Sequence, residues 1–255
     1  DKEEDKEEEE KKEDKEKRED KEEEEKKEDK EKREDKEEEE KNKNKYLPFI
    51  SDNQFTSIVD NIYDKYKEMN DNGMKKFKKN ILDPFKLLFD MHGNNISYNH
   101  WKEREIQRQS DKTINNLIGY FHQKILGSCK GWINLDDSEL KYGVDLCNDK
   151  YTIFVEVKNK YNTMNSSSKR DVLRRLDLIK SEIHNAETYI CIIIPKTKKN
   201  IDRIITGKDL YSIVTNDKNG LSKVIFALDR RLTELSNESK LCKFTIDCFR
   251  DSCLI

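Results

Sequence analysis

Several features that would place the chain outside the cytosol, or give it a zinc site or a nucleotide site, are missing from this sequence. The six cysteines form no Cys-x-x-Cys pair and no zinc-like grouping with the four histidines, which argues against a structural zinc site. Neither a signal-peptide pattern nor a long apolar run is present, so we expect a cytoplasmic protein with reduced thiols and no membrane partner. Gly207 and Lys208 lack the GxxxxGK[ST] frame, which argues against nucleotide hydrolysis.

The first 45 residues, here called the tail, contain no apolar side chain and cannot join a hydrophobic core. A 15-residue unit, DKEEEEKKEDKEKRE, occupies 5–19 and 20–34, and a partial third copy follows. Pairs such as Glu7 with Lys11 support an isolated helix, whereas a disordered spacer is the alternative. We assign this charged, low-complexity tail no catalytic role, and we expect one catalytic domain, here called the body, over residues 46–255.

Charge is divided unevenly between these two parts. The tail holds 26 of the 54 acidic residues and 17 of the 51 Lys and Arg residues, so it carries −9 and the body carries +6. A basic body suits a polyanionic partner such as DNA, although many proteins without such a partner carry a similar excess.

The spacing of apolar residues in the body predicts an α/β architecture. Positions 55–66 and 77–89 predict two packed helices, and 101–126 predicts a longer one. Strands are expected at 132–135, 143–147 and 151–158, with a turn at Asn148 and Asp149 that makes the last two a hairpin. The remaining expected elements are a helix at 169–185, a buried strand at 189–194, and helices at 208–214 and 221–235.

Candidate catalytic residues occur in the hairpin segment. Side chains alternate along a strand, so Glu156 and Lys158 share one face while Val155 and Val157 point to the core. Asp145 lies on the preceding strand, where hairpin pairing brings its carboxylate beside that of Glu156. Two carboxylates beside a lysine form a hard-oxygen site suited to Mg²⁺.

Each of these groups has a task in phosphodiester hydrolysis. Asp145 and Glu156 would hold the metal, and Lys158 would orient a water molecule or stabilise developing negative charge. The alternative is a solvated, charged strand end, because the D-x10-E-x-K spacing also arises by chance. Three features favour catalysis: the charges end a strongly apolar strand, a Gly-Val-Asp strand precedes it, and a helix and strand follow it.

Four runs of sequence resemble a known family: IGYFHQKILG at 118–127, Gly131-Trp132, Val144-Asp145-Leu146, and VEVKNKYNTMNSSS at 155–168. They are similar to type II restriction endonucleases of the PD-(D/E)xK superfamily that cut GGWCC or GGNCC. The likeness extends from about Tyr46 past Pro195. Val144 replaces the proline of the motif's name, which puts little in doubt because that proline contributes no ligand.

The resemblance implies a restriction-endonuclease-like core, with a central mixed β-sheet flanked by helices. It also implies Mg²⁺-dependent cleavage of double-stranded DNA by a homodimer, each subunit serving half of a palindromic site. A separate methyltransferase would protect the host DNA. The exact target is less secure, because related scaffolds change specificity through loops.

Two residues of the long helix are further candidates for the active site. Glu105 would add an acid to the metal site, or would be an ordinary exposed helical acid. His122 would contact a phosphate or water, or would be a hydrogen-bonded packing histidine.

A polar run that leaves the catalytic strand and enters a helix predicts DNA contacts, because amides, hydroxyls and a helix N-terminus bind phosphates and base edges. An ordinary capped loop is the alternative. The candidates are Asn159, Lys160, Asn162, Asn165, Ser166, Ser167, Ser168 and Lys169. Arg170, Arg174 and Arg175 would then form either a basic face beside the DNA or a simply solvated one.

Two other functions remain open at this stage. One is a repair or junction-cleaving nuclease with the same metal site, which would cut branched or damaged DNA without sequence preference. The other is an inactive DNA-binding or structural protein, for which Glu156→Ala and Lys158→Ala would change nothing.

Overall fold

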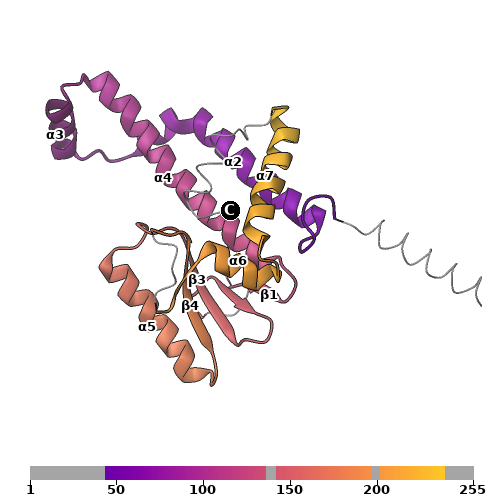
Figure 1. Cartoon of the computed structure of the whole chain (residues 1–255). Coiled ribbons are helices and arrows are strands. Elements are labelled where there is room, and N and C mark those ends of the chain that lie inside the picture. The colour runs from indigo at the N-terminus through magenta and orange to yellow at the C-terminus, as the bar shows by residue number, and fades with distance from the viewer. Residues whose placement is uncertain (1–43, 136–141, 197–201, 239–255) are drawn as a thin grey trace, which may run out of the picture. The chain divides into compact units, whose positions relative to one another are not determined.

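The computed structural model describes residues 44–135, 142–196 and 202–238 (Figure 1). The predicted helix or spacer of the tail therefore lies outside the described residues, as do Cys242, Cys248 and Cys253. The other three cysteines are buried and free, as expected. None of the described helices combines the length and the hydropathy of a membrane span.

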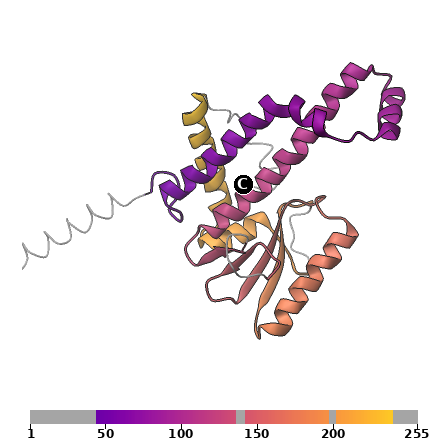
Figure 2. The same ribbon diagram turned by 180° about the vertical axis from the view of Figure 1, so that it is seen from behind.

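Three helices precede the sheet: α2 (Asp52–Lys79), α3 (Pro84–Asn94) and α4 (Tyr98–Gly127). The side chain of Ser51 accepts a hydrogen bond from the backbone N–H of Gln54 at 3.3 Å, which caps the first turn of α2. Helices α2 and α4 lie against each other in both views (Figures 1 and 2). The long predicted helix at 101–126 is confirmed by α4.

The prediction of a packed helix at 77–89 is wrong about where the helix starts and about its burial. Phe77 belongs to the last turn of α2, and the chain then breaks before Asp83, which caps α3 through hydrogen bonds from Phe85 N and Lys86 N. Pro84 favours this new helix start because its fixed φ suits the first helical position. The apolar residues of α3 do not form a packed core, since this helix has no buried residue.

A five-stranded mixed sheet has the order β1-β2-β3-β4-β5. Its strands are β1 (Trp132–Asn134), β2 (Leu146–Asn148), β3 (Ile153–Lys160), β4 (Glu187–Ile194) and β5 (Ile204–Thr206). The pairs β1/β2 and β2/β3 are antiparallel, whereas β3/β4 and β4/β5 are parallel. Helix α5 (Ser166–Glu182) makes the crossover from β3 to β4. The predicted mixed sheet with flanking helices is thus confirmed.

The second strand begins later than predicted, at Leu146 rather than Gly143. Gly143 has φ +70°, a left-handed conformation that a regular strand does not use. Asp145 therefore lies in the bend just before β2, although its backbone C=O still accepts from Leu135 N–H at 2.9 Å. The predicted turn between β2 and β3 is present, and it is stabilised because Asn148 Oδ1 accepts hydrogen bonds from the backbone N–H groups of Thr152 and Ile153.

Each face of the sheet is covered by its own layer of side chains. On one face, Val155 and Val157 pack with residues of α2, α4, α6 (Gly207–Thr215) and α7 (Gly220–Ser236). On the other, Phe154 and Ile190 pack with Val172 and other residues of α5. Figure 1 shows α5 on the opposite side of the sheet from α6. The short strand β5 was not predicted, because three residues give no readable alternation.

Candidate active site

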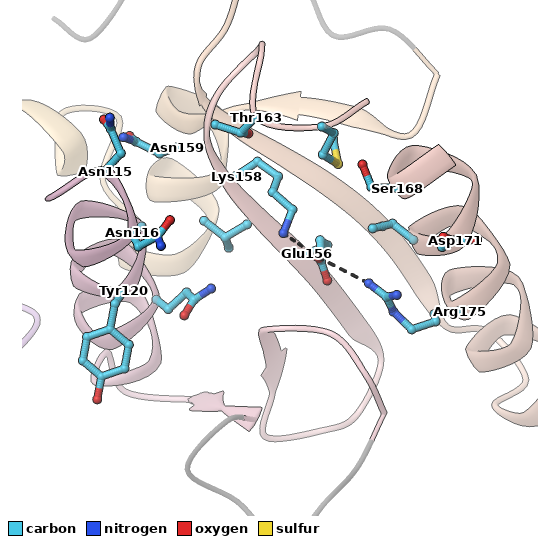
Figure 3. Close-up of a pocket in the computed structure, with 15 residues that line it drawn as sticks. Asn115, Asn116, Tyr120, Glu156, Lys158, Asn159, Thr163, Ser168, Asp171 and Arg175 are labelled. Atoms are coloured by element: carbon cyan, nitrogen blue, oxygen red, sulfur yellow. Dashed lines mark hydrogen bonds and ion pairs between the residues drawn. The ribbon is translucent and has the colours of Figure 1, made fainter. Parts of the chain in front are cut away.

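The alternation of β3 places Glu156 and Lys158 on the sheet face that carries α5, as the sequence predicts. Glu156 is 5% exposed, yet its carboxylate is paired: Lys158 Nζ lies 2.6 Å from Glu156 Oε1. A buried carboxylate requires such a partner, since an unpaired buried charge is costly. The two groups form the floor of a cleft (Figure 3).

Asp145 reaches the same strand from the bend before β2. Its Oδ2 accepts a hydrogen bond of 2.6 Å from the backbone N–H of Val157, the residue between Glu156 and Lys158. The carboxylate is thereby fixed beside β3 by a charge-assisted hydrogen bond. This contact holds Asp145 at the backbone of β3 between Glu156 and Lys158.

Arg175 of α5, which the sequence analysis assigned with Arg170 and Arg174 to a basic or solvated helix face, lies in the cleft beside Glu156. Its Nη2 lies 3.5 Å from Glu156 Oε1, so Lys158 and Arg175 converge on one carboxylate oxygen (Figure 3). Gly143 leaves room for it, because a Cβ there would lie 2.8 Å from Arg175 Cδ. The buried Arg175 Nε has no hydrogen-bond partner in the described part of the chain, which leaves a donor available to a ligand.

A cleft of about 580 Å³ surrounds these groups, with α4 on one side and α5 on the other (Figure 3). Helix α4 contributes residues at helical spacing, namely Asn115, Asn116, Gly119, Tyr120 and Gln123. Helix α5 does the same with Ser168, Asp171, Val172 and Arg175. This i, i+3, i+4, i+7 spacing is the signal that would have predicted Arg175, and Asp171, from the sequence.

The predicted DNA-binding residues divide into three groups. Asn159 and Ser168 line the cleft. Asn165 caps α5, since its Oδ1 accepts from Ser168 N at 2.8 Å, which is the structural role that the alternative assigned to the run. The others are exposed and do not line the cleft: Lys160, Asn162, Ser166, Ser167 and Lys169.

Asn159 combines burial with an unused hydrogen-bonding group. It is 7% exposed, and its Oδ1 has no hydrogen-bond partner among the described residues. A buried, unpaired acceptor costs free energy unless a ligand or water satisfies it. Asn159 and Asn115 of α4 both line the cleft (Figure 3).

Glu105 is not among the residues that line this cleft, so the structure gives no support for its predicted place in the active site. It precedes Asn116 by eleven residues on α4, about 16 Å along the helix axis. It is not an exposed acid either: it is 7% exposed, and Arg108 Nη2 lies 2.6 Å from its Oε1. The pKa of Glu105 is lowered, mainly by hydrogen bonding from Arg108.

His122 is likewise absent from the cleft lining, and the structure shows the packing alternative. Its Nδ1 lies 2.9 Å from the hydroxyl of the buried Tyr211 on α6. Burial lowers the pKa of His122 to about 4, so the imidazole is neutral at pH 7. The ring joins α4 to α6 through Tyr211.

The oxygen ligands available in the cleft fit a hard cation. Glu156 lines the cleft, and Asp145, which does not line it, approaches β3 from the bend before β2. Mg²⁺ is commonly bound through one or two carboxylates while it keeps several waters. No cluster of three or more His, Cys, Asp or Glu side chains suited to a metal occurs within 44–135, 142–196 and 202–238. The donor set therefore fits Mg²⁺ better than Zn²⁺, which favours several nitrogen or sulfur ligands.

Comparison with known proteins decides the family. The model of the Eco47II restriction endonuclease family matches residues 47–236, which include every residue of the cleft. The chain belongs to the Eco47II restriction endonuclease family. This match confirms the resemblance to type II restriction endonucleases that the sequence motifs indicated, and it leaves the tail unmatched.

Two relatives of this family are similar along most of their length. The type II restriction enzyme Sau96I of Staphylococcus aureus is 31% identical over 207 residues, covering 72% of this chain and 78% of the relative. The type II restriction enzyme Eco47II of Escherichia coli is 32% identical over 217 residues, covering 75% of this chain and 89% of the relative. The family likeness thus extends over both the helical region and the sheet.

Proposed function

We propose that this member of the Eco47II family is a Mg²⁺-dependent type II restriction endonuclease of the cytoplasm, which hydrolyses phosphodiester bonds in double-stranded DNA. The observation that carries the proposal is the hydrogen bond from Val157 N–H to Asp145 Oδ2. It holds the Asp145 carboxylate at the backbone of Val157 in β3. The residues on either side of Val157 in the sequence are Glu156 and Lys158. That arrangement is the one needed to hold a metal ion and to charge-stabilise a reacting phosphate.

Each side chain then has a role in the cleft. Asp145 and Glu156 would bind the metal ion, which when bound polarises the scissile phosphate and lowers the pKa of a water molecule. Lys158 would hold the attacking water or stabilise the negative charge that develops on the phosphate. Arg175 would supply a second positive charge, and its planar guanidinium matches phosphate oxygens.

The DNA would lie along the cleft and the polar run that follows β3. Asn159 and Ser168 line the cleft and are the leading contacts. The exposed Lys160, Asn162, Ser166, Ser167 and Lys169 would contact the phosphates next to it, while Asn165 would act through its cap. A net charge of +6 on the body favours this polyanionic partner.

We further infer that two copies of the chain act on a palindromic site, GGWCC or GGNCC. A homodimer supplies one cleft for each strand, so both strands can be cut symmetrically. A separate methyltransferase of the same restriction system would protect the host DNA. These points rest on the motifs shared with the family and on the position of the cleft.

The test is digestion of unmethylated phage or plasmid DNA of known sequence with purified protein and Mg²⁺, followed by mapping of the ends. We expect discrete fragments that end at GGWCC or GGNCC. Glu156→Gln and Lys158→Ala should lose cleavage by about 100-fold or more while DNA binding persists. Lys150→Ala is the matched control, because Lys150 is an exposed lysine in the β2–β3 turn and should leave cleavage unchanged.

Three other outcomes would point elsewhere. Discrete ends at a different sequence would keep the enzyme class and remove the assigned target. Cutting of branched DNA without sequence preference would indicate a junction nuclease. Failure of folded protein to cut with either Mg²⁺ or Mn²⁺ would indicate an inactive DNA-binding protein.

A further inference from the structure

Helix α3 presents a row of large apolar side chains to solvent. Phe85 is 74% exposed, Leu88 is 56% exposed and Phe89 is 80% exposed, and Ile81 in the segment just before the helix is 95% exposed. The spacing of three and four residues places Phe85, Leu88 and Phe89 on one side of α3. We call these four residues the α3 stripe.

The opposite side of α3 is held against α4. Asp90 accepts a hydrogen bond of 3.1 Å from Trp101 Nε1, and Leu87 and Met91 are partly buried on the same side. The α3 stripe therefore points away from the helix that α3 contacts. Both views show α3 at the end of α4 that is remote from the sheet (Figures 1 and 2).

The stripe is as large as the largest apolar patches that monomeric proteins leave in water. Four side chains with these exposures present roughly 600 Å² of surface, at the top of the range for the largest apolar patch of a monomeric protein. The stripe contains no charged residue, so it offers nothing to the phosphates of DNA. Its occupant must itself be apolar.

We propose that the α3 stripe of one chain packs against the same stripe of a second copy. Two such patches would bury about 1,200 Å², the lower end of stable and specific protein interfaces. The stripe is also self-complementary in position. Phe85 and Phe89 lie one helical turn apart, so two antiparallel α3 helices related by a two-fold axis midway between them bring Phe85 of each to Phe89 of the other, with Leu88 close to the axis.

The purpose of this interface rests on the proposed function: a dimer would give each DNA strand its own cleft. Trp101 contacts α3, and Asn116 lines the cleft fifteen residues further along α4, about 22 Å along the helix. The two α4 helices would then extend from a common centre toward two symmetric clefts. A palindromic site requires that symmetry.

The mass of the full chain in solution tests the interface without DNA or metal, so its result is independent of the nuclease assignment. By sedimentation equilibrium, we expect the wild type to be a dimer at micromolar concentration. Phe85→Glu with Phe89→Glu should raise the dimer dissociation constant by roughly 100-fold or more. Leu88→Glu should act similarly, whereas the matched control Leu178→Glu, at a 60% exposed leucine on α5, should not.

Circular dichroism and thermal unfolding of the variants establish that they are folded, as expected for substitutions at exposed positions. A wild type that is monomeric throughout would overturn the proposal. So would a dimer that persists in the Phe85 and Phe89 variant, because the interface would then lie elsewhere.

Cross-linking gives a second measurement that does not depend on disrupting the interface. Because a two-fold axis brings a residue near it close to its own copy, Leu88→Cys should form an intermolecular disulfide under mild oxidation. Leu178→Cys and the unmodified chain are the controls for the native thiols. An intramolecular bridge from Leu88→Cys to Cys242, Cys248 or Cys253 would overturn the proposal, since a segment of the same chain would then cover the stripe.

Discussion

Arg175 is the side chain whose place in the site most changes the expected chemistry. It approaches the same oxygen of Glu156 as Lys158 does, and under the proposed function a cation held by Glu156 would leave the guanidinium available to a phosphate oxygen. We expect Arg175→Ala to lower kcat for cleavage by about 100-fold, with a smaller change in KM. Single-turnover cleavage rates at saturating enzyme would measure this.

The neighbouring arginine provides the control for that prediction. Arg174 lies on the same helix, its side chain is 79% exposed, and it does not line the cleft. Arg174→Ala should therefore weaken DNA binding at most slightly and leave kcat unchanged. Equal losses in the two variants would mean that Arg175 acts only as part of a general basic surface.

His122 predicts a pH dependence of folding stability. Its pKa falls from 6.5 to about 4 on folding, so the unfolded chain binds the proton more readily. The stability that this residue contributes is complete above pH 6.5 and is lost as the pH falls toward 4. At pH 5 the loss is up to about 2 kcal/mol.

Urea unfolding at pH 7.5 and pH 5 measures this effect. His122→Gln can keep a hydrogen bond to Tyr211 but cannot be protonated, so it should lose less stability than the wild type between the two values. An identical loss in both proteins would assign the pH dependence to other groups.

The junction of β4 and α6 depends on close contact between two elements. A Cβ at Gly207, the first residue of α6, would lie 2.6 Å from the backbone oxygen of Ile193 and 2.7 Å from its Cα. Backbone atoms of a central strand cannot move aside cheaply. We expect Gly207→Ala to lower the free energy of unfolding by about 1 to 3 kcal/mol, measured by urea denaturation.

Gly93 of α3 offers a matched glycine-to-alanine substitution that should not lower the free energy of unfolding. No atom lies within 4 Å of a Cβ at this position. Because alanine favours helix more than glycine does, Gly93→Ala should leave stability unchanged or raise it by up to about 1 kcal/mol. A comparable loss in both variants would show that the β4–α6 contact is not the cause.

The complete chain carries opposite charges on its two parts, and this predicts how the tail affects DNA binding. The tail contributes −9 and the body +6, and the family match begins only at residue 47. We expect a chain of residues 46–255 to cleave with the same specificity and to bind non-specific DNA more tightly at low salt. Binding titrations at 50 and 200 mM salt would measure the difference, which screening should reduce at the higher concentration.

Loss of specific cleavage by residues 46–255, with the fold intact, would contradict that expectation. It would give the tail a role in catalysis or assembly that its composition does not indicate.

The sequence by itself determined the features that depend on local pattern. Alternation along 153–160 placed Glu156 and Lys158 on one face, helical spacing identified α4, and the motif run at 155–168 indicated the family. Predictions from alternation and helical spacing succeed because the periods of strands and helices are set by backbone geometry alone. Asp145 was also selected correctly as a neighbour of that strand, since the hairpin turn is local.

Tertiary structure decided everything that depends on which elements meet. The approach of Arg175 to Glu156 requires α5 to cross over the sheet, and the separation of Glu105 from the cleft follows from the length of α4. His122 could not be distinguished from a phosphate ligand until Tyr211 was seen beside it. The apolar residues of α3 have the pattern of a packed helix, and only their positions in space show that nothing in the described chain covers them, because periodicity records which side chains share a face and not what that face contacts.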